Sequence, residues 1–138
     1  MENYKYLKIT NSLLFISIIF YFLYSKKNLI ETSLVTSLYV TIFFTQIFWS
    51  NPIKNSLVHK IDAIVAKMVI FSFIFYTIFL KLITIYLIVS YWFVLIFIGI
   101  SFYLSNYYSS QIWCCNKHII SHGCLHIFCF IATFYAFI

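Results

Sequence analysis

Three histidines recur at four-residue intervals near the end of the chain: His118, His122 and His126. If this stretch is helical, their imidazoles follow one face, displaced by about 40° per step at about 3.6 residues per turn. The segment that carries them, residues 118–138, is otherwise largely apolar. An imidazole inside a membrane helix is costly unless it meets a partner, a cavity or a metal ion. The spacing therefore marks these histidines as candidates for a functional site.

A fourth histidine and a carboxylate, His59 and Asp62, precede another apolar run. They are three residues apart, so they share one stripe of a helix. If the apolar runs cross a membrane in alternation, this helix and the one that opens at His118 start on the same side. Imidazole nitrogens and carboxylate oxygens are ligands of Zn²⁺. We therefore predict that His122 and His126 face Asp62 and bind one Zn²⁺ ion. His59 is the preferred third ligand, with His118 as the alternative.

The same residues also have plainer interpretations. His118 stands where an interfacial polar anchor is expected. His122 and His126 are also compatible with simple hydrogen bonds between helices. Asp62 is compatible with a helix-start anion that the helix dipole favours. Ligation of a haem by one histidine from each of two helices is a further option.

Composition bounds the class of protein. Of 138 residues, 64% are hydrophobic and only 9% are charged, whereas soluble domains have about 25% charged residues. The formal net charge is +6, but the lysines separate apolar runs rather than gathering on one soluble face, as nucleic-acid binding would require. The chain is therefore expected to be an integral membrane protein. Its expected partners are membrane lipids and not nucleic acid, and self-association into a homo-oligomer stays open.

Five apolar runs predict an all-α polytopic transmembrane helix bundle, a single transmembrane domain over residues 1–138. The runs cover residues 9–24, 33–49, 63–80, 82–104 and 118–138. The first run is short for a bilayer core that needs about 20 residues, so four spans, with the first run lying in the interface, is the alternative. Trp49, Trp92 and Trp113 are expected in the aromatic belts at the two interfaces.

The lysines indicate an orientation. With five spans, the N-terminal side receives more of them than the opposite side: Lys5, Lys8, Lys54, Lys60 and Lys117 against Lys26, Lys27 and Lys81. Because the positive side is usually cytoplasmic, we predict a cytoplasmic N-terminus and a C-terminus on the far side. Gly123, beside His122, is expected to let another helix approach closely.

Two segments carry a resemblance to known proteins. Residues 57–63 read Leu-Val-His-Lys-Ile-Asp-Ala before an apolar run, and residues 121–128 read Ser-His-Gly-Cys-Leu-His-Ile-Phe. They resemble the Asp-containing start of the third helix and the His-x-x-x-His motif of the last helix in hemolysin III-like proteins. These belong with the progestin/adipoQ receptors and alkaline ceramidases. The resemblance implies Zn²⁺ on His122 and His126 near the cytoplasmic face, with Asp62 as the catalytic residue that orients a metal-bound water.

The chain departs from that family in two respects. The family has Ser-x-x-x-His at the end of its second helix, and the histidine is the third ligand. Here the corresponding stretch, residues 45–49, reads Thr-Gln-Ile-Phe-Trp, with Trp49 in place of the histidine. The family also has seven helices rather than five, although the loss of two helices between the motifs would preserve their sidedness.

The leading interpretation is a multi-pass membrane protein with a His/Asp metal site near the cytoplasmic face. A complete zinc site would polarise a lipid amide or ester carbonyl and activate water for hydrolysis. Whether the protein is an enzyme stays open, because the histidine of the family's first motif is missing. The alternative is a structural or pore-forming membrane protein in which the histidines have no catalytic role.

Overall fold

The computed structural model describes residues 3–81 and 83–138, and every regular element within them is helical. The helices are α1 (Lys5–Ser12), α2 (Leu14–Tyr24), α3 (Leu29–Phe48), α4 (Leu57–Phe75), η1 (Tyr76–Leu80), α5 (Ile85–Gln111) and α6 (Asn116–Phe137). η1 is a π-helical turn that continues α4, and it ends where the N–H of Lys81 donates to the carbonyl of Tyr76 at 2.9 Å. The all-α prediction is confirmed.

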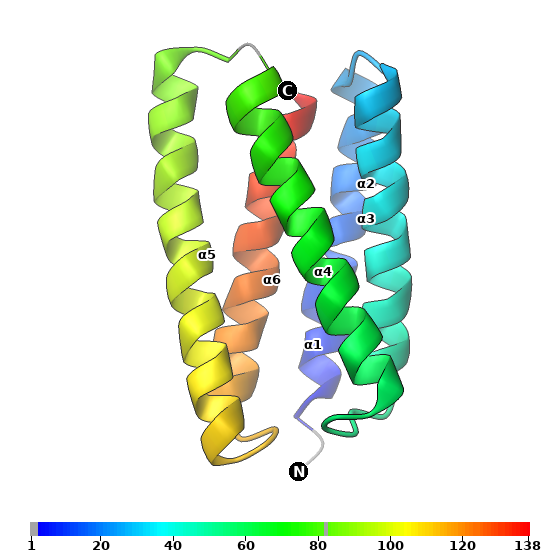
Figure 1. Ribbon diagram of the computed structural model, residues 1–138, viewed down its shortest axis with the longest axis vertical. Coiled ribbons are helices and arrows are strands. Elements are labelled where there is room, and N and C mark those ends of the chain that lie inside the picture. The colour runs from blue at the N-terminus through cyan, green and yellow to red at the C-terminus, as the bar shows by residue number, and fades with distance from the viewer. Residues whose placement is uncertain (1–2, 82) are drawn as a thin grey trace.

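Five helical segments are long and apolar enough to cross a membrane. α1 and α2 are separated only by Leu13 and together form the first segment, Lys5–Tyr24, while α4 and η1 form the third. The count agrees with the five predicted runs. The first segment has 20 residues, so it is not confined by length to the interface, as the four-span alternative supposed. The chain ends lie at opposite ends of the bundle (Figure 1), as an odd number of spans requires.

The helices extend beyond the apolar runs. α3 and α4 begin at Leu29 and Leu57, several residues before the predicted runs, and α5 covers Ile85–Gln111 rather than 82–104. Leu82, where the fourth run was expected to begin, lies outside the described residues. Polar residues continue a helix readily once its end is capped, so hydropathy marks only the part that lies in hydrocarbon.

Three helices share one local start. In each, a residue with positive φ stands directly before a capping residue: Lys27 before Asn28, Asn55 before Ser56, and Cys114 before Cys115. The cap side chain accepts a hydrogen bond from the backbone N–H three residues on, at 2.8 Å in α3, 3.2 Å in α4 and 3.4 Å in α6. These caps satisfy donors that a helix start leaves free. They also fix His59 and His118 as the third residues of α4 and α6.

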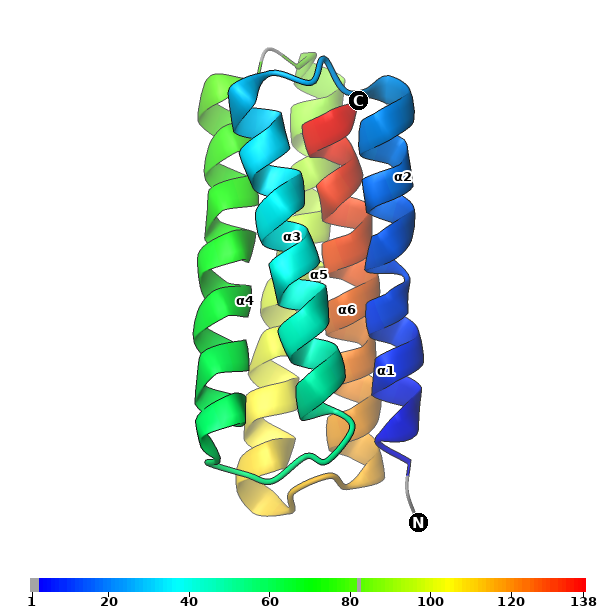
Figure 2. The same cartoon turned by 90° about the vertical axis from the view of Figure 1, so that its right-hand side faces the viewer.

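α6 is the central helix of the bundle. It packs against α5 on one side and against α1 and α2 on another, and it touches α4 more lightly. α3 packs against α4 and against the α1–α2 segment, and Figure 2 shows it standing between them. α4 and α5 do not pack closely along their length, and Figure 1 shows the two helices apart with α6 behind them. The interior of the bundle is therefore covered on this side only by the side chains that lie between α4 and α5.

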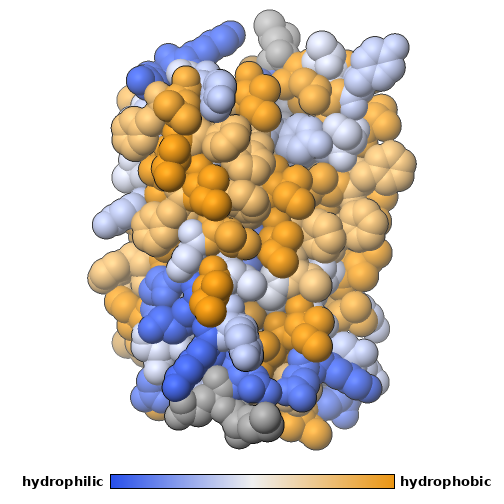
Figure 3. Space-filling view, turned by 180° about the vertical axis from the view of Figure 1, so that it is seen from behind, coloured by the Kyte–Doolittle hydropathy of each residue, from blue (hydrophilic) through white to orange (hydrophobic). Residues whose placement is uncertain are grey.

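The outer surface carries a hydrophobic band. Figure 3 shows apolar side chains across the middle of one face and hydrophilic side chains toward the two ends. Large apolar side chains are exposed on the outward faces of all five segments: Phe22, Phe43, Phe71, Phe93 and Ile120. Lipid tails are as apolar as these side chains, so their exposure is favourable in a membrane. The surface and the five segments together support an integral membrane location.

Candidate ligand-binding pocket

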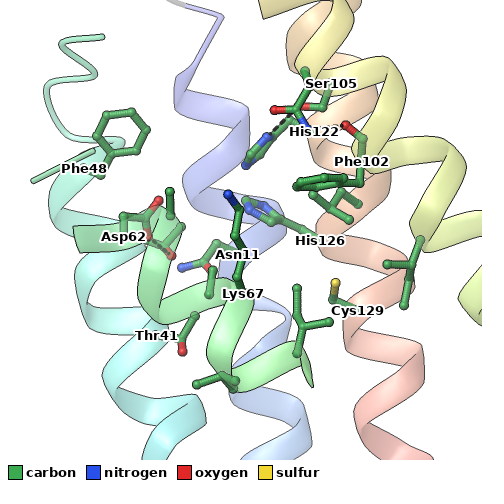
Figure 4. A pocket seen from close by; sticks show the side chains of 18 of the residues that line it. Asn11, Thr41, Phe48, Asp62, Lys67, Phe102, Ser105, His122, His126 and Cys129 are labelled. Atoms are coloured by element: carbon green, nitrogen blue, oxygen red, sulfur yellow. Dashed lines mark hydrogen bonds between the residues drawn. The ribbon is translucent and has the colours of Figure 1, made fainter. Parts of the chain in front are cut away.

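A cavity of about 460 Å³ lies between α3, α4, α5 and α6, with Asn11 of α1 at its back (Figure 4). Its lining includes all the predicted site residues: His59, Asp62, His118, His122 and His126. Farther along the bundle the lining is mostly apolar and includes Phe73, Ile98 and Ala132, with the hydroxyl-bearing Tyr91 and Thr133 among them. The volume lies within the range of about 300–1,000 Å³ that is usual for small-molecule sites.

The cavity opens sideways between α4 and α5. Lys67 of α4, with Phe102 and Asn106 of α5, lines it and is also exposed at the outer surface. The Nζ atom of Lys67 lies 5.9 Å from the ring centroid of Phe102, a cation–π contact across the opening. Lys67 is the fifth residue of the apolar run 63–80 and stands about 6 Å beyond its start at about 1.5 Å per residue, inside the hydrocarbon core. The opening therefore faces lipid tails.

The three histidines of α6 follow its inner face. Ring centroids are 5.8 Å apart between His118 and His122 and 4.8 Å apart between His122 and His126. Nδ1 of His122 lies 2.9 Å from Ser105 Oγ, a contact drawn in Figure 4, and Nδ1 of His126 lies 2.9 Å from Thr10 Oγ1. The two hydroxyls hold the rings of His122 and His126 in place. Within the described residues, Nε2 of His122 makes no hydrogen bond.

His59 and His118 serve the starts of their helices. Nδ1 of His59 accepts a hydrogen bond from the backbone N–H of Asn55 at 3.0 Å, and Nδ1 of His118 accepts one from that of Cys114 at 3.2 Å. With the helix caps, these bonds form reciprocal arrangements that resemble a capping box. Because a backbone N–H can only donate, each neutral ring carries its proton on Nε2. Both histidines are thus structural as well as cavity-lining.

Asp62 is buried and links two helices. Thr45 Oγ1 of α3 donates to Asp62 Oδ1 at 2.6 Å, and the side chain is 7% exposed. This bond gives the carboxylate a partner beyond the dipole of its own helix. Thr45 is the first residue of the stretch that stands where the resembled family has Ser-x-x-x-His. The bond joins α3 to α4 beside the cavity.

Trp49 does not lie in an interfacial belt, contrary to the prediction. It is 1% exposed, and its ring lies edge-on to His122 at 5.1 Å and nearly parallel to Trp113 at 6.3 Å. Its Nε1 atom is buried and has no hydrogen-bond partner among the described residues. Trp92, 52% exposed on the outside of α5, does face outward. Whether a tryptophan faces the interior or the outer surface depends on the rotation of its helix, and the position in the sequence alone does not give that rotation.

The charges around the cavity are few. Lys54 and Lys67 oppose Asp62 in the lining, so with neutral imidazoles the cavity carries one net positive charge. Lys54 Nζ donates to the carbonyl of Ser109 at 2.8 Å and lies 5.7 Å from the ring centroid of Trp113. Just outside α6, burial raises the pKa of the Cys114 thiol. The end of the cavity near the N-terminus is therefore neutral to positive.

The predicted metal ligands share the cavity without forming a metal cluster. Over residues 3–81 and 83–138, no three His, Cys, Asp or Glu side chains are grouped so that they could hold a metal ion. His59 and His118, the candidates for the third ligand, each use Nδ1 for a backbone donor. His122 and His126 remain as a pair, whereas catalytic zinc takes three protein ligands. The donors therefore do not fit a complete zinc site, and the Zn²⁺ ion stays a prediction.

Several residues of the site escape identification from the sequence. Ser105 and Thr10 hold the two histidines from positions 17 and 116 residues away, and Trp49 and Lys67 line the cavity. The signal that could find the hydroxyls is their position within long helical runs, because polar side chains there tend to face other helices. No such signal separates Trp49 from an ordinary belt residue.

No protein-family model, curated protein or solved structure matches the chain. The resemblance to hemolysin III-like proteins therefore rests on the two motifs alone. The cavity and its lining are the basis for a candidate function.

Proposed function

We propose that this integral membrane protein binds an amphiphilic, lipid-like ligand in its intramembrane cavity. The observation that carries the proposal is the polarity gradient of the lining. Asp62, His122 and His126 lie toward the end near the N-terminus, while Phe73 and Ala132 lie toward the other end. The ligand's hydrocarbon chain lies among the apolar side chains, and its polar head meets the histidines. It enters between α4 and α5, directly from the bilayer.

Unpartnered polar groups support this proposal. Within the described chain, Trp49 Nε1 is buried without a hydrogen bond, and His122 makes its hydrogen bond through Nδ1, which leaves Nε2 unused. A polar group without a partner in an apolar environment is unfavourable by about 1–3 kcal/mol on the evidence of protein mutations. The head of a bound amphiphile supplies the missing partners.

Quenching of tryptophan fluorescence by an alkyl chain that carries bromine tests the binding. In a Trp92→Phe background the remaining indoles, Trp49 and Trp113, both line the cavity. The brominated chain is expected to quench them saturably in detergent-solubilised protein. Ala66→Phe, which places a ring in the lining, should abolish the saturable part. Met68→Phe, on the exposed side of α4, is the matched control. Non-saturable quenching that is equal in all three proteins contradicts the proposal and favours a purely structural role.

A second candidate function is metal-assisted hydrolysis of a lipid ester or amide. It is favoured by the adjacent rings of His122 and His126, since histidines that ligate metals usually have their second nitrogen held by a hydrogen bond. Asp62 lines the same cavity. The donor set is incomplete, so this candidate requires a third ligand from outside the described arrangement.

Metal analysis of the purified protein tests the second candidate. Stoichiometric zinc that is lost in a His122→Ala/His126→Ala variant, together with hydrolysis of a lipid ester or amide, supports it. His59→Gln is the control, because glutamine keeps an acceptor for the Asn55 N–H. Absence of bound metal and of hydrolysis contradicts it and leaves ligand binding as the function.

We also propose that the N-terminus is cytoplasmic. Support comes from the larger number of lysines at that end of the bundle. Reporter domains fused before Met1 and after Ile138 are expected to report opposite sides, with the first in the cytoplasm. An extracytoplasmic report from the first fusion would reverse the orientation.

A further inference from the structure

The polar end of the cavity, near the starts of α4 and α6, gathers hydrogen-bond donors. Because His59 and His118 accept backbone N–H groups at Nδ1, their neutral rings present N–H at Nε2. Trp49 adds a third N–H, which is buried. His118 is 2% exposed and Trp49 is 1% exposed. No acceptor within the described ranges takes a hydrogen bond from any of these three N–H groups.

Trp113 brings the three donors into one cluster. Its ring centroid lies 5.2 Å from that of His59, 5.0 Å from that of His118 and 6.3 Å from that of Trp49. The rings of Trp49 and His118 are 6.2 Å apart. All four residues line the same cavity. The four rings therefore pack together along one part of the cavity lining.

Charge favours an anionic group over a cationic one. The ammonium of Lys54 lies over Trp113, and Lys54 and Lys67 outnumber Asp62 in the lining. Asp62 already accepts from Thr45 and stands three residues beyond His59, or about 4.5 Å farther along the helix. The groups without a partner at this polar end of the cavity are thus donors, and a ligand that is rich in acceptors matches them.

The depth of the cluster agrees with a lipid head. His59 and His118 are the third residues of α4 and α6, about 3 Å from the helix starts. That level lies near the boundary between hydrocarbon and headgroups, where lipid phosphates are found. The apolar part of the cavity continues from there toward the bilayer centre.

We propose that Trp49, His59 and His118, with Lys54, bind a tetrahedral oxyanion of the phosphate class. The oxyanion is either the phosphomonoester head of a single-chain lipid or free inorganic phosphate. This inference rests on the proposed function where the lipid is concerned, because the apolar part of the cavity then holds the chain.

Three probes separate these cases in a maltoside detergent, which contributes no phosphate. Dodecyl phosphate, dodecanol and inorganic phosphate are titrated against the full-length Trp92→Phe protein, and the fluorescence of Trp49 and Trp113 is followed. Dodecyl phosphate is expected to bind at least about tenfold more tightly than dodecanol, the factor that one hydrogen bond to a charged group provides.

Trp49→Phe gives the sharpest variant. It removes an N–H that has no partner among the described residues, so it breaks none of their hydrogen bonds. It should reduce the preference for dodecyl phosphate over dodecanol about tenfold while leaving dodecanol binding nearly unchanged. Cys129→Ala, deeper in the same lining, is the matched control and should keep the full preference. His118→Gln retains an acceptor for the Cys114 N–H and should also weaken the preference.

Each outcome has one meaning. Equal affinity for dodecyl phosphate and dodecanol overturns the oxyanion site but leaves amphiphile binding intact. Binding of neither chain overturns the proposed function, and the absence of phosphate binding as well overturns this inference. Inorganic phosphate that binds as tightly as dodecyl phosphate supports the site and assigns the free ion as its ligand. A preference that survives both Trp49→Phe and His118→Gln overturns the residue assignment.

Discussion

Two groups of buried polar side chains, one near each end of the bundle, differ in how far their hydrogen bonds are satisfied. At the end away from the N-terminus, the carboxylate of Glu31 accepts hydrogen bonds from Ser25 Oγ and, at 2.6 Å, from Tyr76 Oη. Lys81 donates to the carbonyl of Ala136 at 2.7 Å. Burial lowers the pKa of Lys81, and the nearby Glu31 carboxylate opposes that shift. At the end near the N-terminus, by contrast, Trp49 Nε1 and several imidazole Nε2 atoms have no hydrogen-bond partner among the described residues.

This difference separates polar groups that hold the fold from polar groups that await a ligand. Glu31 joins the α2–α3 connection to η1, and its acceptors are in use. A fully satisfied buried network stabilises one arrangement, whereas an unsatisfied group is unfavourable until something binds it. The Glu31 network therefore contributes to stability, and the groups near the N-terminus are the place to look for function. Thr77 Oγ1 and Tyr91 Oη, which lie nearer the opposite end, are also buried without a hydrogen-bond partner among the described residues, so the contrast holds for the Glu31 network and not for every polar group at that end.

Glu31→Leu is expected to give the largest effect on stability. It leaves the buried hydroxyl of Tyr76 and the half-buried hydroxyl of Ser25 without their acceptor, so the free energy of unfolding should fall by about 2–4 kcal/mol. Unfolding in mixed micelles, followed by circular dichroism, measures the change. Glu31→Gln keeps acceptor atoms and should lose less. The comparison between the two ends fails if Trp49→Phe destabilises as much as Glu31→Leu.

Gly123→Leu should give the next largest loss of stability. A Cβ atom at Gly123 would already lie 3.7 Å from side-chain carbons of Leu7 and Thr10, whereas one at Gly99 would meet nothing within 4 Å. A leucine at position 123 pushes α1 away from α6 and disturbs the Thr10–His126 contact, at a cost of about 1–3 kcal/mol. Thermal unfolding of both variants measures it. Equal tolerance of Gly123→Leu and Gly99→Leu would contradict the packing described for α1.

Thr45→Val tests an exception near the N-terminus. Asp62 has a protein hydrogen-bond partner there, so it resembles Glu31 and differs from the unpartnered groups around it. Loss of the hydroxyl removes the hydrogen bond to Asp62 Oδ1 and should cost about 1–2 kcal/mol. Chemical unfolding in micelles measures the loss, and Thr45→Ser, which preserves the donor, serves as the control. Stability that is unchanged in Thr45→Val would mean that Asp62 belongs with the unsatisfied groups.

His59→Ala should give the smallest effect, about 1 kcal/mol, the usual scale of a helix-capping interaction. The variant removes the acceptor for the Asn55 N–H, so that amide should exchange its hydrogen faster. His59→Gln restores an acceptor and should be nearly neutral, as glutamine is a regular partner in capping boxes. Unchanged exchange at Asn55 in His59→Ala would show that the ring has no capping role.

Hydropathy predicts the five helices because each must present about 20 apolar residues to the bilayer. The sequence also indicates, through Gly123, where α1 approaches α6. Hydropathy underestimates helix lengths at Leu29 and Leu57, since polar residues outside the hydrocarbon carry no apolar signal but are capped into the helix by Asn28 and Ser56.

The cavity lies beyond what the sequence predicts. Its existence depends on α4 packing against α3 rather than against α5. No local sequence pattern predicts which of the two helices α4 packs against. Periodicity indicates that His118, His122 and His126 share a face. It does not distinguish a histidine that caps a helix from one that only lines a cavity. That distinction comes from the backbone of Cys114, whose φ of 56° aims its N–H at His118.

The π-helical turn η1 gives the third span one residue more than an α-helix of the same rise. Deleting a single residue from Tyr76–Leu80 would restore α-helical hydrogen bonding while the residues on both sides kept their register. Lys81 would then stay beside Ala136, and the segment before Tyr76 would keep its place. The span can therefore change in length by one residue at this turn without moving Asp62 or the rest of the α4 wall of the cavity.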